Sequence, residues 1–141
     1  EETFNMIEKQ LLLMRINVIK ELDLHIPIIR AEKNLLKQAF LNIILNAANA
    51  MPNGGTLTVT TLTNENNKIL IIFKDTGCGI PLKNIDKIFD PFFSTMPVGQ
   101  GTGLGLSITY SIIKHHGGAI HAESTVGKGS IITIKIPIKN T

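Results

Sequence analysis

The chain has 141 residues, of which 43% are hydrophobic and 18% are charged, and its net charge is +3. This is the size and composition of one globular domain with its own core, without the apolar run of ~20 residues that would cross a bilayer. The single cysteine excludes an internal disulfide, and scattered lysines with only 5% aromatic residues disfavour nucleic-acid binding.

The first half of the chain predicts two helices and two short strands. Charged residues mixed with Leu and Met at helical spacing predict a short helix over residues 1–14, which we interpret as a leading helix or the remnant of a linker. Short strands are predicted over 16–22 and 28–31. A long helix over 32–51 follows and stops at Pro52-Asn53-Gly54-Gly55.

The second half predicts a hairpin, two further helices and a final pair of strands. The strands are expected over 56–62, 68–74, 119–124 and 130–136, the helices over 81–89 and 102–116, and a mobile loop over 90–101. These elements predict an α/β fold, a two-layer sandwich in which about three helices cover one face of a mixed sheet of about five strands.

Four polar residues lie in register on the long apolar helix. Gln38, Asn42, Asn46 and Asn49 are spaced by four and three residues, which keeps their side chains within an arc of ~100°. Buried amides must find partners or cost roughly 1–3 kcal/mol each. The stripe therefore either pairs with other protein groups or forms the floor of a polar ligand site. An amide oxygen is also a hard, neutral ligand that suits Mg²⁺.

A glycine-containing turn, Asp75-Thr76-Gly77-Cys78-Gly79-Ile80, follows the central strand. An aspartate in this position can accept a hydrogen bond from an exocyclic amine such as adenine N6. The glycines let the backbone approach a flat ring without a Cβ clash. The alternative interpretation is a glycine turn with a capping aspartate.

A second glycine-rich segment, residues 99–107, reads Gly-Gln-Gly-Thr-Gly-Leu-Gly-Leu-Ser and leads into a helix. Exposed N–H groups and the positive end of a helix bind phosphate. The segment is not a P-loop, since no Gly-Lys-Ser/Thr closes it, and its context differs from a Rossmann fingerprint. The alternative is a flexible hinge. The preceding Phe89-Asp90-Pro91-Phe92-Phe93-Ser94-Thr95 predicts a hydrophobic anchor, which could serve as the hinge of a lid.

The order of these four motifs resembles the catalytic, ATP-binding domain of bacterial sensor histidine kinases, within the gyrase, heat-shock chaperone and mismatch-repair ATPase superfamily. The resemblance covers roughly residues 16–138. It implies a Bergerat-type sandwich that binds ATP and Mg²⁺ and transfers the γ-phosphate to a histidine on a separate domain.

The resemblance also implies roles for individual residues. Asn46, in the segment 36–51, would be the Mg²⁺ ligand, and Phe89, Phe93, Gly127 and Gly129 would belong to conserved motifs of the family. The residues implied to contact the nucleotide are Asn46, Asn49, Asp75, Gly77, Gly79, Ile80, Phe92, Thr95, Gly101, Thr102, Gly103, Leu104, Gly105, Leu106 and Ser130.

Two positions bear on the reaction. ATP-hydrolysing relatives place a glutamate one turn before the Mg²⁺ asparagine, where it activates water as a general base. This chain has Asn42 there, which cannot take up a proton. We therefore take Asn42 and Asn46 as the candidate catalytic residues, with histidine rather than water as the acceptor.

Met96 stands where related kinases often carry a lysine that reaches the γ-phosphate. Methionine cannot supply that charge, and cationic clamps are a major source of stabilisation in phosphoryl transfer. This favours an alternative function, a nucleotide-dependent interaction module with weak or no catalysis. A self-contained ATPase is a third hypothesis, and Asn42 argues against it.

The expected partners also follow from the resemblance. They are the dimerisation and phosphoacceptor domain of the same protein and the receiver domain of a response regulator, with no nucleic acid and no direct membrane contact. We expect a single domain over residues 1–141 in the cytoplasm, whether or not the parent protein is anchored in a membrane.

Overall fold

The computed structural model of the chain describes residues 2–22, 33–63, 68–79, 85, 87–89 and 105–137. In this part of the chain three helices and five strands are formed. In chain order they are α1 (Glu2–Leu13), β1 (Ile16–Leu22), α2 (Lys33–Asn49), β2 (Gly55–Thr63), β3 (Lys68–Asp75), α3 (Gly105–His115), β4 (Ala119–Thr125) and β5 (Gly129–Pro137).

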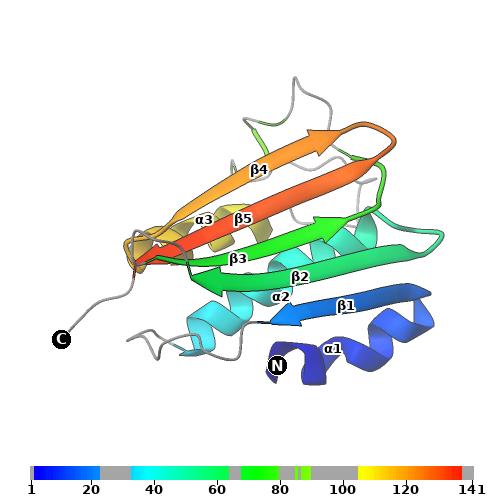
Figure 1. Ribbon diagram of the computed structural model, residues 1–141, viewed down its shortest axis with the longest axis horizontal. Coiled ribbons are helices and arrows are strands. Elements are labelled where there is room, and N and C mark those ends of the chain that lie inside the picture. The colour runs from blue at the N-terminus through cyan, green and yellow to red at the C-terminus, as the bar shows by residue number, and fades with distance from the viewer. Residues whose placement is uncertain are drawn as a thin grey trace.

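The strands form one mixed sheet in the order β1-β2-β3-β5-β4 (Figure 1). β1 and β2 run parallel and are joined through α2, as a parallel pair requires a crossover connection. The other three pairs are antiparallel. The predicted two-layer α/β sandwich with a mixed sheet is therefore confirmed.

Most predicted elements match the observed ones to within a few residues. The long helix expected over 32–51 is α2, and the strands expected over 56–62 and 68–74 are β2 and β3. The helix expected over 102–116 is α3, described from Gly105 onward. The strand expected over 28–31 and the loop over 90–101 lie outside the described residues.

The short helix expected over 81–89 falls largely outside the described residues as well. Ile85 and residues 87–89 lie in turns. Phe89 is half-buried, and its ring lies 5.8 Å from that of Tyr110 on α3.

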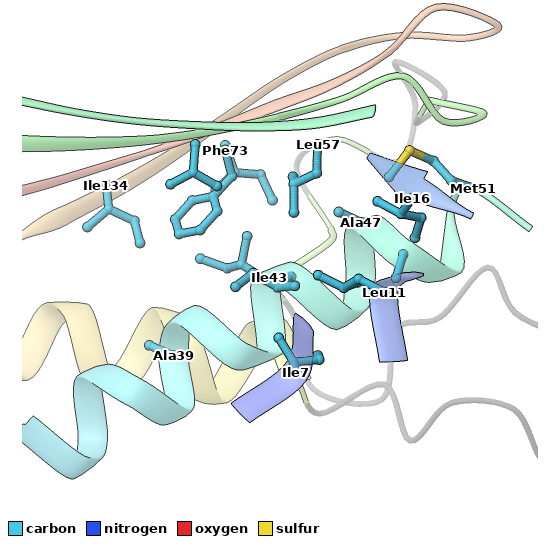
Figure 2. Packing of buried hydrophobic residues seen from close by; sticks show 14 of the residues in the cluster. Ile7, Leu11, Ile16, Ala39, Ile43, Ala47, Met51, Leu57, Phe73 and Ile134 are labelled. Carbon is cyan, nitrogen blue, oxygen red and sulfur yellow. The ribbon is translucent and has the colours of Figure 1, made fainter. Parts of the chain in front are cut away.

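The core lies between the helices and one face of the sheet (Figure 2). Ala39, Ile43 and Ala47 follow each other at intervals of four residues on α2, so they share one face of the helix. They face buried side chains of the sheet, including Leu57 and Phe73. α1 adds Ile7 and Leu11 to the same cluster. In the described part of the chain, no helix is both long and apolar enough to cross a membrane.

The central position of α2 in this core predicts a large effect of truncating Ile43, which is 1% exposed. We expect Ile43→Ala to lower the free energy of unfolding by roughly 2–5 kcal/mol, because it leaves a cavity that the neighbours cannot fill. Leu13→Ala is the matched control, since Leu13 is 86% exposed and should change stability by no more than about 0.5 kcal/mol. Equal losses in urea denaturation would contradict the packing described here.

Candidate functional site

Asp75 is a buried carboxylate at the end of the central strand β3, with 7% of its surface exposed. Its Oδ1 accepts a hydrogen bond from the backbone N–H of Gly77 at 2.9 Å. Burial raises the pKa of this carboxyl group, while hydrogen bonds from the backbone N–H groups of Gly77 and Ser130 act in the opposite direction. These bonds hold the carboxylate in one orientation at the end of the central strand.

The backbone of the turn after Asp75 is tied to two other segments. The N–H of Cys78 donates to the carbonyl of Ala50, just beyond α2, at 3.0 Å. The carbonyl of Cys78 accepts from the N–H of Gly127, in the turn between β4 and β5, at 2.9 Å. Three segments that are distant in the sequence therefore meet at the turn.

These contacts bring the backbones so close that glycines at the turn have no room for a side chain, and Gly79 and Gly129 are two examples. A Cβ on Gly79 would lie less than 3.0 Å from the backbone of Thr125, and one on Gly129 would lie less than 3.0 Å from the backbone of Asp75. Both residues also have positive φ angles, +79° and +126°. The predicted residues Asp75, Gly77 and Gly79 are thus brought together with the turn that precedes Ser130.

Ser130, on β5, lies directly opposite Asp75 on β3 and opposite Ser124 on β4. Its Oγ lies 2.9 Å from Ser124 Oγ, and Ser124 Oγ donates to the carbonyl of Gly129 at 2.9 Å. Ser124 was not among the predicted site residues. The signal that could have found it is the hairpin register, which pairs the last residues of one strand with the first of the next.

An open pocket of about 240 Å³ lies at this end of β3, β4 and β5. Its lining residues are Lys74, Asp75, Glu123, Ser124, Thr125, Lys128, Gly129, Ser130 and Ile131. By the strand register, Lys74, Ile131 and Glu123 share the face of the sheet opposite to Asp75, Ser130 and Ser124. The residues that line the pocket therefore come from both faces of the sheet at this end.

The polar stripe of α2 lies on the side of the helix away from the centre of its buried positions. Asn42 and Asn46 are half-buried, whereas Gln38 and Asn49 are exposed. At 100° per residue, the centre of the stripe lies about 150° around the helix from the centre of the buried positions. Those positions are Ala39, Ile43, Ile44, Ala47 and Ala48. Exposure therefore differs along the stripe, and its half-buried members are the two candidate catalytic residues.

Asn46 lies one helical turn before Ala50, whose N–H donates to the Asn46 carbonyl at 3.1 Å. The carbonyl of Ala50 also accepts the hydrogen bond from Cys78, in the turn after Asp75. Backbone hydrogen bonds therefore connect the residue that carries the Asn46 amide to the turn that follows the Asp75 carboxylate. Within the described residues, no group of three or more His, Cys, Asp or Glu side chains could hold a metal ion. A single half-buried amide oxygen fits Mg²⁺, which usually keeps several waters and takes few protein ligands.

The predicted phosphate-binding segment is described only in part. Gly105 is the first residue of α3, and Leu106 is half-buried and packs against the core. The other predicted contacts in this region and before it lie outside the described residues. They are Ile80, Phe92, Thr95, Gly101, Thr102, Gly103 and Leu104.

The chain is similar in sequence to known proteins over most of its length. Residues 31–140 match the family described as histidine kinase-, DNA gyrase B-, and HSP90-like ATPase. Sporulation kinase E of Bacillus subtilis is 42% identical over 125 residues, which cover 87% of this chain and 17% of that protein. The signal transduction histidine-protein kinase AtoS of Escherichia coli is 39% identical over 138 residues, which cover 98% of this chain and 22% of that protein. The chain therefore spans between 17% and 22% of the length of these two relatives.

Solved structures have the same fold. The catalytic domain of histidine kinase ThkA matches with a TM-score of 0.85 at 31% identity, covering 99% of this chain and 91% of that one. The complex of histidine kinase ThkA with response regulator protein TrrA matches with a TM-score of 0.81 at 29% identity, covering 98% of this chain and 39% of that one.

The close approach at Gly129 yields a prediction with an internal control. Gly127 and Gly129 both have positive φ, but a Cβ on Gly127 would meet nothing within 4 Å. We expect Gly127→Ala to cost about 1–2 kcal/mol from backbone strain alone. Gly129→Ala should cost a further 1–3 kcal/mol or so, because the methyl group must displace backbone. Both values come from urea denaturation, and equal costs would show that the approach to Asp75 is not tight.

Proposed function

Because the chain belongs to the histidine kinase, DNA gyrase B and HSP90-like ATPase family, in its sensor histidine kinase branch, we propose that it binds Mg·ATP and transfers the γ-phosphate to a histidine on a separate dimerisation domain. The observation that carries the proposal is the buried, oriented carboxylate of Asp75. It lies at a turn fastened to the end of the helix that carries Asn46.

Asp75 would recognise the base. Its carboxylate is held by N–H groups from Gly77 and Ser130 and can accept a further hydrogen bond from the exocyclic amine of adenine. Since Asp75 is largely buried, a base with no donor there would leave a desolvated carboxylate without that partner. This supports selection of adenine at the sheet end.

Asn46 would bind the metal ion, and the segment leading into α3 would bind the phosphates. Gly105 is the first described residue of α3, and the positive end of a helix favours anions. The glycines at 101 and 103 would bring further N–H groups to the same phosphates. Mg²⁺, when bound, neutralises the charge that develops on the phosphate oxygens during transfer.

Asn42 indicates which group accepts the phosphoryl group. It lies one turn before Asn46 on the same half-buried side of α2, and its amide cannot take up a proton from water. A histidine imidazole is already a competent nucleophile and needs no such base. The chain therefore supports phosphoryl transfer to histidine over hydrolysis.

The wider reaction sequence is part of the proposal. The phosphoryl group would pass from the histidine to an aspartate of a response regulator receiver domain, in the cytoplasm. The solved complex of ThkA with the response regulator protein TrrA supports a partner of this kind. The roles of Ile80, Phe92, Thr95 and Leu104 remain predictions from the resemblance.

The direct test mixes the chain with Mg·ATP and the dimerisation domain of its parent protein. We expect acid-labile phosphohistidine on that domain and none on the chain alone. ATP binding without phosphohistidine would instead favour the interaction module that Met96 suggests, a residue outside the described part of the chain. Steady ATP turnover near or above about 1 s⁻¹ without the acceptor, in the range of ordinary enzymes, would favour an ATPase.

The role of Asn46 can be tested apart from catalysis. We expect Asn46→Ala to lower the affinity for ATP in Mg²⁺ by about tenfold or more, since even indirect partners of a metal site are worth that much. In the presence of a chelator, the variant and the wild type should bind ATP equally. Asn34→Ala is the matched control, because Asn34 is an exposed asparagine of the same helix. A loss that persists in the chelator would rule out a metal ligand at position 46.

A further inference from the structure

Two serine hydroxyls lie in one row with Asp75 on the helix-facing side of the sheet, with Ser130 between Asp75 and Ser124. Asp75, Ser130 and Ser124 are directly opposed neighbours on β3, β5 and β4, so their side chains project to the same face. Ser130 is 6% exposed and Ser124 is half-buried. The geometry of these two hydroxyls fixes where their protons lie.

Each serine has one hydroxyl proton to donate. Ser124 Oγ lies 2.9 Å from the carbonyl oxygen of Gly129, which can only accept, so Ser124 donates its proton to that carbonyl. The contact of 2.9 Å between Ser124 Oγ and Ser130 Oγ needs a proton of its own. Distance alone allows either hydroxyl to donate in this contact, but with the Ser124 proton on the Gly129 carbonyl the donor is Ser130 and the acceptor is Ser124.

Ser130 consequently has no hydroxyl proton left for a ligand. Its Oγ offers only lone pairs to the space beside Asp75, which lies directly opposite on β3. In its ionised form the Asp75 carboxylate likewise only accepts. Two acceptors side by side complement a group with N–H donors. They repel a carbonyl oxygen in the same place.

We propose that Ser124 is a specificity-determining positioning residue, which fixes the Ser130 hydroxyl as an acceptor and so selects a 6-aminopurine over a 6-oxopurine. The inference rests on the proposed function, since it assumes that the base lies against Asp75. Ser124 need not touch the nucleotide. It acts by accepting the hydrogen bond from the Ser130 hydroxyl, so that this proton is not available to a ligand.

Loss of the Ser124 hydroxyl changes this arrangement without removing Ser130. The Ser130 hydroxyl is then free to rotate, and it can donate to the O6 atom of a 6-oxopurine. Binding of ATP should change little, because Asp75 still accepts from the amine. Binding of inosine triphosphate, which has a carbonyl oxygen in place of that amine, should improve.

The experiment measures the affinities of ATP and inosine triphosphate, each with Mg²⁺, by calorimetry on the 141-residue chain. We expect wild type to favour ATP, and Ser124→Ala to reduce the ratio of the two affinities about fivefold, the worth of one ordinary hydrogen bond. Ser124→Thr keeps the hydroxyl and should keep the wild-type ratio. Thr133→Ala is the matched control, because it removes a hydroxyl from β5 on the opposite face of the sheet.

A double-mutant cycle separates proton placement from a structural effect. In a Ser130→Ala background, Ser124→Ala should leave the affinity ratio unchanged. Ser124→Cys keeps the side-chain volume but makes poor hydrogen bonds, so it should reduce the ratio even if the alanine variant folds badly.

The outcomes distinguish this inference from the proposed function. An equal loss of both affinities in Ser124→Ala, or an unchanged ratio in both the alanine and cysteine variants, would overturn the role of Ser124 while leaving ATP binding intact. Failure of the wild-type chain to bind ATP would overturn the proposed function, and the inference with it.

Discussion

The site depends on two hydrogen bonds made by the backbone of one residue, Cys78. Its N–H holds the carbonyl of Ala50 at the end of α2, and its carbonyl holds the N–H of Gly127 in the β4–β5 turn. Asp75 lies three residues earlier, so its position is set relative to both the helix and the hairpin. The thiol of Cys78 itself is exposed, and what matters at this position is the backbone, which needs glycine on either side to come close enough.

The helix α2 serves the core and the site with opposite faces. Its apolar face, with Ile43 and Ala47, packs against the sheet, and the polar stripe lies on the less buried side of the helix. Burial of the first face fixes the rotation of the helix about its own axis, because turning it would expose several aliphatic side chains. The core therefore determines where the amides of Asn42 and Asn46 point.

The helices and strands could be predicted from the sequence because their hydrophobic patterns are strong, as in β2 and in the continuous apolar run of β3. The sequence also singled out Asp75 as a candidate site residue, because it stands at an abrupt change from apolar residues to glycines. It did not reach Ser124, because a serine in a strand has no local signal and its role arises from pairing with Ser130 across the hairpin. Nor could the sequence predict which of the four polar residues of α2 are exposed, since the exposure of Gln38 and Asn49 depends on tertiary packing.

In the function proposed above, recognition of the base and chemistry at the phosphate fall to different groups of residues. The groups at the base end, Asp75, Ser124 and Ser130, are held by strand pairing and by backbone donors, so they are in place before any ligand binds. At the proposed phosphate end, Asn46 would offer one neutral oxygen, and a metal ion bound there would take its remaining ligands from phosphates and water. A change among the serines should therefore alter which nucleotide binds, whereas a change at Asn42 or Asn46 should alter what happens to its phosphate. In the described residues, the hydrogen bond from Cys78 N–H to the Ala50 carbonyl and the contact of Thr76 Oγ1 with Met51 Sδ join the two ends. Neither contact involves the side chain of Asp75 or Asn46, so the proposed base pocket can stay the same while the acceptor of the phosphoryl group changes from water to histidine.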